Sequence, residues 1–519
     1  STPIEQKYFI AFCGFIAREN MRAKMGIASS EKNRGQARLW TLGELEKNQS
    51  FMLLNKLELE QVDNSGKNTI LHFKKSAGTN PLANFRIGDI IVLYPNGQRP
   101  TGQQLFKASL LAIHQNSVQV RLRNKQHNTA TFSNNAFWNA EHDHIDSGFN
   151  QMYGSIAELI AAPSNKKALI LGTRPPEEKP TYNQTFDYPL TVQQQELLNQ
   201  MLSKQEFFLL WGPPGTGKTS RMLRYFVQWI LEHTSENILL LSYTNRAVDE
   251  ICAAVYEIGP NAKQQLMRIG STTSASTEFT TAFLNEKIKG LNDRKKVKAL
   301  LLKQRVVVST VSSLLNNQEI LDLMDFDRVL IDEASQIPEP MLVGLMVKLK
   351  HPILIGDHKQ LPAVVVQHEK YSAVEDEDLA SIGLKNMRNS FFERMYKLAL
   401  NNQWSYVLGQ LSYQGRMHQQ IMQFPAQHFY DGHLNILSTE ADPSQSQQVP
   451  LQWTTKNNSE YLEQQLRTKR LLFLPTAINE LEPWAKLNQD EAEQTADVIS
   501  CLISMYQEQG IDMNTDRIV

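Results

Sequence analysis

The stretch FFLLWGPPGTGKTSRML, residues 207–223, decides the fold. It holds the pattern GxxxxGK(S/T) between an apolar run typical of a buried strand and a helical stretch. Glycines in such a loop let backbone amides close around phosphate oxygens at a helix N-terminus. This context favours a nucleotide-binding loop over the alternative, a glycine turn that binds nothing. The residues assigned to the nucleotide are Gly212, Pro213, Pro214, Gly215, Thr216, Gly217, Lys218 and Thr219.

Two side chains of this loop have specific chemistry. Lys218 can reach the β and γ phosphates, and the hydroxyl of Thr219 is placed to bind Mg²⁺. The stretch VLIDEASQIPEP (329–340) supplies partners for both. Asp332 can hold the metal through its water shell, and Glu333 can orient and deprotonate the attacking water. The alternative for the acidic pair is an N-cap of the following helix.

A third polar group lies in ILIGDHKQLPAVV, residues 353–365. Gln360 could hydrogen-bond both the γ phosphate and the lytic water, so we predict a catalytic role for it. The alternative is a polar loop that follows a strand and has no role in chemistry.

Five short runs of continuous apolar residues are typical of buried parallel strands, and each ends in a polar cluster. Ligands of open parallel sheets bind at the carboxyl ends of the strands, so these clusters are expected to converge on one site. The runs are FFLLW (207–211), NILLLSY (237–243), RVVVST (305–310), RVLID (328–332) and PILIGD (352–357).

The composition excludes several classes of protein. The 519 residues have a net charge of −1 and 41% hydrophobic content, enough for two to four domains. No apolar run approaches the roughly 20 residues of a membrane span, and the N-terminus lacks the basic start of a signal peptide, so we expect a cytoplasmic protein without membrane contact. Cys13, Cys252 and Cys501 are too far apart for a disulfide framework or a zinc or iron–sulfur site. The basic stretches 121–127 and 293–305 read most simply as solvated faces.

The sequence pattern of the N-terminal part changes from helical to strand-like and then back to helical. Residues 1 to about 60 are rich in Glu, Lys and Leu and indicate helices. The runs FRIGDIIVLY, LFKASLLAIHQ and SVQVRLRN, which lie between residues 85 and 124 and are separated by turns, then predict a small antiparallel barrel or sheet. Helical pattern returns at 152–162.

The motifs together resemble superfamily 1 helicases, in the branch of the nonsense-mediated-decay RNA helicases and the eukaryotic flap-processing helicase–nuclease. The resemblance runs from about residue 142 to the end. It is carried by GPPGTGKT, SYTNRAVDEI (242–251), DEASQIPEP, GDHKQLP (356–362), SFFERM (390–395) and LSYQGRMHQQIMQFPAQHFYDGHL (411–434).

This resemblance implies a motor that uses ATP and Mg²⁺. Two RecA-like domains would close around single-stranded nucleic acid when ATP binds and reopen on hydrolysis, which moves the protein 5′ to 3′. Gln194 would read the adenine, or else be a surface glutamine. Arg416 would reach the γ phosphate from the second domain, or else be a solvated arginine at a helix start. Gly415 stands where relatives usually have tyrosine, so we expect a more mobile loop there.

Four polar residues at strand ends are the candidates for contacting the strand. They are Thr244, Asn245, Ser309 and Thr310. Their small hydroxyl and amide groups could bond phosphates without reading bases, as a stepping motor requires. Helix capping is the alternative for each.

The expected fold is α/β, with a P-loop RecA-like parallel-sheet domain, a second, incomplete RecA-like domain and a small β-barrel inserted on helical stalks. After LLFLPT (471–476), read as a strand, and a helix in 488–509, the chain reaches DRIV where a further strand should begin. We therefore expect this sequence to be an excerpt of a longer protein, which continues past Val519 and supplies a second arginine. The 519 residues alone should hydrolyse ATP poorly. The expected boundaries are 1–83 for a helical stalk region, 84–140 for the barrel, 141–189 for a stalk helix and connector, 190–385 for the first RecA-like domain and 386–519 for the second.

The motif residues look closer to those of the flap-processing DNA branch than to those of the RNA-decay branch. This resemblance favours DNA over RNA as the single-stranded partner. No cysteine ligands of an iron–sulfur nuclease module are present, and backbone contacts alone do not separate the two nucleic acids. We expect a monomer or one part of a larger complex. The alternatives are an RNA helicase of the same branch, and a nucleotide-gated scaffold that binds nucleic acid without unwinding it. An intact Glu333 speaks against the scaffold.

Overall fold

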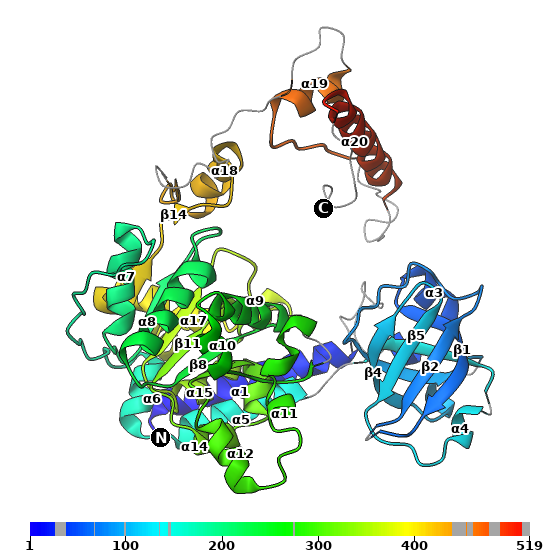
Figure 1. Cartoon of the computed structure of the whole chain (residues 1–519), viewed down its shortest axis with the longest axis horizontal. Helices are drawn as coiled ribbons and strands as arrows, with labels where there is room; N and C mark the ends of the chain where they lie inside the picture. Colours follow the sequence, from blue (N-terminus) through cyan, green and yellow to red (C-terminus); the bar gives the residue numbers. More distant parts are fainter. Residues whose placement is uncertain are drawn as a thin grey trace. The chain divides into compact units, whose positions relative to one another are not determined.

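The computed structural model describes residues 1–25, 38–66, 68–97, 100–133, 135–143, 147–272, 276–437, 453, 460–476 and 488–510 (Figure 1). The chain divides into two compact units. The first comprises Ser1–Gly212 and Gly217–Leu411, and the second comprises Pro213–Thr216 and Ser412–Val519. The strand expected to begin at DRIV lies outside the described residues.

A parallel sheet of seven strands forms the centre of the first unit, in the order β13-β7-β12-β11-β8-β10-β9. All five predicted strands are present, because each continuous apolar run is buried on both faces. The strands are β7 (Phe208–Trp211), β8 (Ile238–Ser242), β9 (Leu266–Ile269), β10 (Val306–Thr310), β11 (Arg328–Ile331), β12 (Pro352–Gly356) and β13 (Leu408–Gln410).

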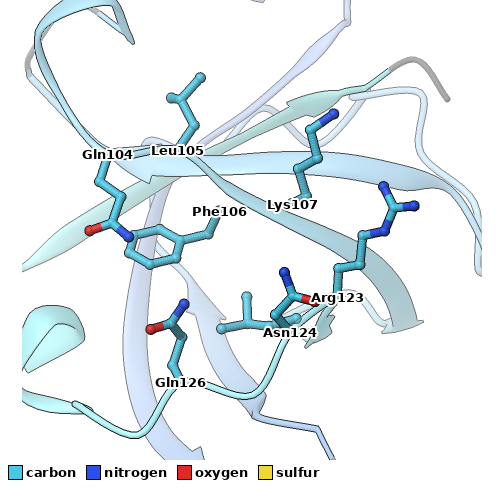
Figure 2. Close-up of a pocket in the computed structure, with 8 residues that line it drawn as sticks. Gln104, Leu105, Phe106, Lys107, Arg123, Asn124 and Gln126 are labelled. Atoms are coloured by element: carbon cyan, nitrogen blue, oxygen red, sulfur yellow. The ribbon is translucent and has the colours of Figure 1, made fainter. Parts of the chain in front are cut away.

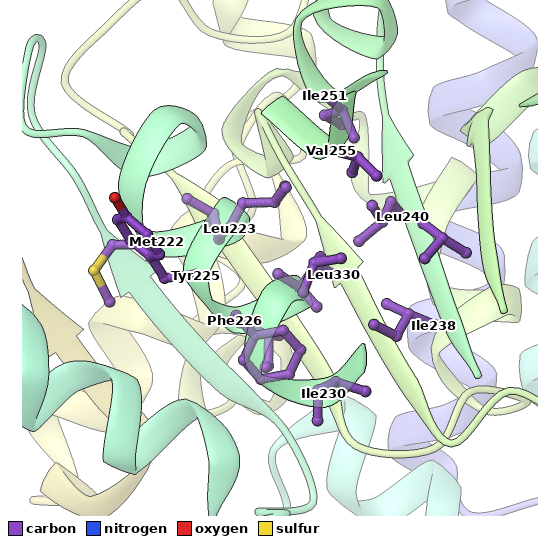
Figure 3. Packing of buried hydrophobic residues seen from close by; sticks show 14 of the residues in the cluster. Met222, Leu223, Tyr225, Phe226, Ile230, Ile238, Leu240, Ile251, Val255 and Leu330 are labelled. Carbon is purple, nitrogen blue, oxygen red and sulfur yellow. The ribbon is translucent and has the colours of Figure 1, made fainter. Parts of the chain in front are cut away.

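Helices cover this sheet and fix the ends of its strands. Figure 3 shows the buried cluster in which Phe226 and Ile230 of one helix and Ile251 and Val255 of another pack beside Leu240 and its neighbours. The helices are α7 (Val192–Leu202), α8 (Arg224–His233), α9 (Asn245–Tyr256), α10 (Pro260–Gln265), α11 (Leu284–Lys287), α12 (Arg294–Leu301), α13 (Val311–Leu315), α14 (Glu319–Leu323), α15 (Glu339–Met346), α16 (Glu377–Ser381) and α17 (Phe391–Asn401).

The N-terminal helix packs against the core of the first unit rather than standing apart. Helix α1 (Pro3–Met25) contacts α5 (Ser147–Ala161), which in turn contacts α15. Helix α6 (Ser164–Leu171) follows α5. These helices are the stalk expected on both sides of the barrel.

The barrel is closed and entirely antiparallel, in the order β1-β2-β5-β4-β3-β6. It starts at Leu53, so the expected start at residue 84 is wrong and the expectation of helices up to about residue 60 fails for its last part. In β1, buried Leu57 alternates with exposed Glu58, a period of two that the helix-forming composition conceals. The strands are β1 (Leu53–Asp63), β2 (Ile70–Lys75), β3 (Ile90–Pro95), β4 (Phe106–Ile113), β5 (Ser117–Leu122) and β6 (Phe137–His142), with helices α2 (Arg38–Thr41), α3 (Glu44–Gln49) and α4 (Ala130–Ser133).

The first unit extends beyond the expected boundary at residue 385. Helix α17 buries Phe391 and Met395 in it, and β13 pairs in parallel with β7 through Leu408, so this strand belongs to the first sheet. The boundary therefore falls after Leu411.

The described part of the second unit is small. It holds β14 (Tyr413–Gln414), α18 (Gln419–Phe429), β15 (Asn435–Ile436), α19 (Tyr461–Thr468) and α20 (Gln489–Glu508). The predicted strand at 471–476 is wrong, because that segment is not a strand and Phe473 is 88% exposed, so no neighbouring strand or helix buries its apolar side chains. The second RecA-like domain remains a prediction. In the described residues, no helix combines the length and apolar character that a bilayer crossing requires.

Candidate functional site

The glycine loop connects the end of β7 to the turn that opens α8. Gly215 and Gly217 have φ values of +75° and +81°, which side chains rarely adopt. A Cβ on Gly212 would lie 2.4 Å from the Lys218 side chain, so that position also requires glycine. The backbone shape that the motif predicts is therefore the one present, and it leads into residues Lys218–Leu223, the first turn before α8.

Lys218 and Thr219 lie where the nucleotide roles require them. The Lys218 ammonium donates to the Gly212 carbonyl at 2.7 Å and is only partly buried, so it can exchange this bond for a phosphate oxygen. The Thr219 hydroxyl donates to Asp332 Oδ2 at 2.6 Å. The two predicted metal-binding residues are therefore in direct contact, although they lie on different elements.

This donor set fits Mg²⁺. A hydroxyl and one carboxylate, with water and phosphate oxygens completing an octahedron, are the ligands that Mg²⁺ takes in phosphate-binding sites. No group of three or more His, Cys, Asp or Glu side chains able to hold a metal occurs among the described residues, so the phosphates would have to supply the rest.

The acidic pair is set by the end of β11. Asp332 is 2% exposed and also accepts the Glu333 amide at 2.9 Å. Glu333 has a φ of +53°, in the left-handed region that residues other than glycine seldom adopt. Gln336 Nε2 donates to Glu333 Oε2 at 3.1 Å. Neither carboxylate caps the following turn, since no side-chain cap is formed there.

Burial dominates the electrostatics of both carboxyl groups. It raises the pKa of Asp332 and of Glu333, while the nearby Lys218 ammonium acts in the opposite direction. A general base with a raised pKa binds a proton more readily, which suits Glu333 to take one from water.

Gln360 is held at the same edge of the sheet by a buried carboxylate. Its Nε2 donates to Asp357 Oδ2 at 2.8 Å, and Trp211 Nε1 donates to Asp357 Oδ1 at 2.8 Å. Asp357 is 1% exposed and its amide donates to the Ser335 hydroxyl at 3.1 Å. Neither Trp211 nor Asp357 was predicted as a site residue, although Trp211 directly precedes the glycine loop and Asp357 lies within the motif GDHKQLP.

Gln194 is not a surface residue. It is 3% exposed and forms a capping box with Thr191, whose amide donates to Gln194 Oε1 at 3.1 Å. The alternative of a surface glutamine is therefore wrong. The T-x-x-Q pattern at 191–194 could have indicated this cap from the sequence.

The four strand-contact candidates differ in what their side chains do. Thr244 and Thr310 are N-caps of α9 and α13, accepting the amides of Ala247 and Ser313. Ser309 is fully buried and its hydroxyl donates to the Thr310 carbonyl at 3.0 Å. The predicted strand contact by Ser309 is therefore not supported, while exposed Thr244 and part-exposed Asn245 stay candidates.

Arg416 belongs to the second unit, together with the loop residues Pro213–Thr216. Its side chain is exposed, and its amide donates to Gln414 Oε1 at 2.8 Å. The neighbouring Gly415 amide donates to the Gly215 carbonyl at 2.9 Å. This bond joins the Arg416 loop to the glycine loop, and the expected mobility of the Arg416 loop stays a prediction.

A polar groove on the barrel was not predicted as a site. It has a volume of about 380 Å³ and lies along the ends of β4 and β5. Figure 2 shows Lys107 and Arg123 on one side and the amides of Gln104 and Gln126 on the other, with Phe106 between them. Arg123 is part of VRLRN, so the basic run at 121–127 was its only signal in the sequence.

Comparison with known proteins agrees with this geometry. One family model described as an AAA domain matches residues 189–297 and 284–368, and a second with the same description matches 387–518. A curated relative, the "DNA replication ATP-dependent helicase/nuclease DNA2" of Bos taurus, is 23% identical over 80% of this chain and 39% of its own length. The chain belongs to this branch of the superfamily 1 helicases. The resemblance read from the motifs is thereby confirmed.

Two further relatives lie in the same branch. The "Regulator of nonsense transcripts 1 homolog" of Neurospora crassa is 26% identical over 49% of this chain and 24% of its own length. The "DNA polymerase alpha-associated DNA helicase A" of Saccharomyces cerevisiae is 23% identical over 61% of this chain and 55% of its own. The chain spans about 40% of the length of the DNA2 relatives.

Among solved structures, an arterivirus helicase in complex with DNA aligns over 73% of this chain and 60% of its own length. The identity is 10% and the TM-score 0.33, too low to support any argument about function.

Proposed function

We propose that this chain is the motor of an ATP-dependent helicase or translocase that moves 5′ to 3′ on single-stranded DNA. The observation that carries the proposal is the meeting of Lys218, Thr219, Asp332 and Glu333 at the carboxyl ends of β7 and β11, three of them joined by a hydroxyl–carboxylate bond and a backbone bond. Gln360 joins this edge through Asp357, and a raised pKa suits Glu333 to act as a base.

The roles follow from what each side chain can reach. The loop amides and Lys218 bind the phosphates, and Thr219 and Asp332 hold the metal. Bound Mg²⁺ would neutralise charge that develops on the phosphate oxygens. Glu333 accepts the proton of the attacking water, and Gln360 hydrogen-bonds that water or the γ phosphate. Arg416 supplies positive charge to the γ phosphate, which makes hydrolysis depend on closure.

DNA is favoured because the DNA2 relatives and the yeast DNA helicase A carry DNA in their names. The nonsense-transcript relative keeps an RNA helicase as the second candidate. The deciding measurement is phosphate release from ATP with and without matched single-stranded DNA and RNA oligonucleotides. We expect turnover to rise on adding DNA, and less on adding RNA.

The Glu333→Gln variant serves as the blank in this assay, since its turnover should stay near background with either oligonucleotide. Binding of DNA without any rise in turnover would favour a nucleotide-gated scaffold. A larger rise with RNA than with DNA would place the chain with the RNA helicases.

A further inference from the structure

The segment from Leu284 to Arg305 concentrates positive charge in a chain that is nearly neutral overall. It contains eight lysines and arginines against two carboxylates, Glu286 and Asp293. Five of the cations are exposed on or directly after α12. We name these five the α12 cations, namely Arg294, Lys295, Lys296, Lys298 and Lys303.

The two carboxylates are already engaged by other groups. Glu286 pairs with Lys289 at 3.3 Å, and Asp293 caps α12 by accepting the Lys295 amide at 2.8 Å. Within the part of the chain that the structure describes, no carboxylate forms an ion pair with any of the α12 cations. Their charge is therefore directed to solvent.

The placement of these charges works against the helix that carries them. Arg294, Lys295 and Lys296 occupy the first turn of α12, and that turn has no acidic residue. A helix N-terminus is the positive end of the macrodipole, so cations there destabilise the helix. Arg294 and Lys298 also lie one turn apart, where like charges repel. A polyanion bound to this surface would relieve both effects.

The surface lies away from the proposed ATP site. Lys287 donates to the Gln264 carbonyl at 3.2 Å and to Gln304 Oε1 at 2.6 Å, and these glutamines precede β9 and β10. The end of α12 is therefore at the amino edge of the sheet. The five residues of β10 separate it by roughly 16 Å from the carboxyl edge, where Asp332 lies. In Figure 1, α12 and α14 lie together at the lower end of the first unit, and α9 lies above them.

The chemistry of the surface fits a duplex backbone better than a single strand. Residues 284–305 contain no aromatic side chain, so unpaired bases have nothing to stack on. Leu301 is buried and anchors the helix, while the α12 cations form a row of exposed side chains. Duplex DNA carries about one negative charge per 1.7 Å of its axis, a density that such a row can match.

We propose that the α12 cations form a second nucleic-acid surface, which binds the phosphodiester backbone of double-stranded nucleic acid outside the stepping site. This inference rests on the proposed function in one respect, namely that the bound polyanion is a nucleic acid. The surface would hold duplex beside the motor without reading its sequence, because lysine and arginine contacts to phosphates carry no base information.

The test is the charge-reversed variant K295E/K296E/K298E in the full chain, with binding of a labelled blunt 20-base-pair duplex followed by fluorescence anisotropy at several salt concentrations. The matched control reverses three exposed lysines that are far apart in the sequence, Lys263, Lys350 and Lys385. We expect at least about a tenfold loss of duplex affinity in the α12 variant and a salt slope smaller by about two to three, since each duplex phosphate contact contributes about 0.9. The control should stay within about twofold of the parent chain.

Two further measurements keep the outcome decisive. Hydrogen exchange should show slower exchange of the α12 amides of the parent chain when duplex is added. ATP turnover without nucleic acid should be the same in the variant and in the parent chain. If the parent chain itself shows no ATP turnover, that result counts against the proposed function and not against this surface. Unchanged duplex binding in the α12 variant, or protection of α12 by a glutamate-rich peptide but not by duplex, would overturn the inference.

Discussion

Glu333 has a local structure that bears directly on its proposed role as the general base in ATP hydrolysis. Its backbone is left-handed, its Oε2 accepts a bond from Gln336, and the side chain is partly buried, so the carboxylate is held in place. Replacing it with glutamine keeps the shape and removes the base. We expect Glu333→Gln to bind ATP normally and to hydrolyse it about 100-fold more slowly or worse, because a general base contributes 10² to 10⁴ in rate.

Single-turnover hydrolysis and the affinity for a fluorescent ATP analogue measure the two effects separately. Glu319→Gln, at an exposed position on α14, is the matched control and should change neither. If the Glu333 variant no longer binds ATP, the residue is structural and the role given to it is wrong.

Lys218 makes a different kind of contribution, since its role is to bind. Its ammonium bonds to the Gly212 carbonyl, and with ATP it would bond a phosphate instead. A hydrogen bond between charged groups contributes about 1.5–3 kcal/mol, so Lys218→Ala should weaken ATP binding by roughly 10- to 100-fold. The thermal midpoint without nucleotide should change little, because the side chain is only partly buried. A titration with the same fluorescent analogue tests this, and unaltered affinity would contradict the assignment of the loop.

At the scale of elements, a buried ion network joins three helices that are distant in sequence. Arg394 of α17 pairs with Glu339 of α15 at 2.8 Å, and Tyr8 of α1 donates to the same carboxylate at 2.5 Å. Both ionic side chains are fully buried, and Arg394 also donates to the carbonyls of Ile170 and Leu171. The network therefore fixes the N-terminal helix and α17 on the helix that follows the acidic motif.

Removing one partner of such a pair leaves a buried charge without compensation. We expect Arg394→Met to lower the free energy of unfolding by about 3–5 kcal/mol. The double variant R394M/E339M should recover most of that loss, because a buried ion pair replaced by apolar groups is often neutral. Urea unfolding followed by tryptophan fluorescence compares the three proteins. Equal losses in the single and double variants would show that packing, and not the unpaired charge, accounts for the effect.

The elements also show which sequence signals are sufficient. Continuous apolar runs predict the five strands that end at motifs, but β9, which is only four residues long, was not among these runs. Strand β1 alternates correctly, yet its leucines, glutamates and lysine are common in helices, and most of it lies within the residues for which helices were expected. Short or helix-like segments become strands here because neighbouring strands complete their hydrogen bonds.

At the scale of the whole molecule, the loop motif and the acidic motif are sufficient to predict where the candidate site lies. The bond between Thr219 and Asp332 is the kind of contact that their positions at strand ends predict. The carboxylate that orients Gln360 and the burial of Ser309 could not be predicted in the same way. They depend on which neighbours the fold brings to each side chain, and a single sequence does not specify that.

The whole chain is expected to bind single-stranded DNA through contacts to its phosphates. The remaining strand-contact candidates are small hydroxyl and amide groups, such as those of Thr244 and Asn245, that can bond phosphates but lack the reach for base edges. Binding to single-stranded DNA should therefore be nearly independent of base order and should weaken steeply with salt, because phosphate contacts release counterions. Anisotropy titrations of a thymidine 30-mer and a mixed-sequence 30-mer between 50 and 200 mM salt should give affinities within about threefold of each other at every concentration. Because stacking alone produces modest preferences, only a difference of tenfold or more for one base order would be inconsistent with a motor that steps along the backbone.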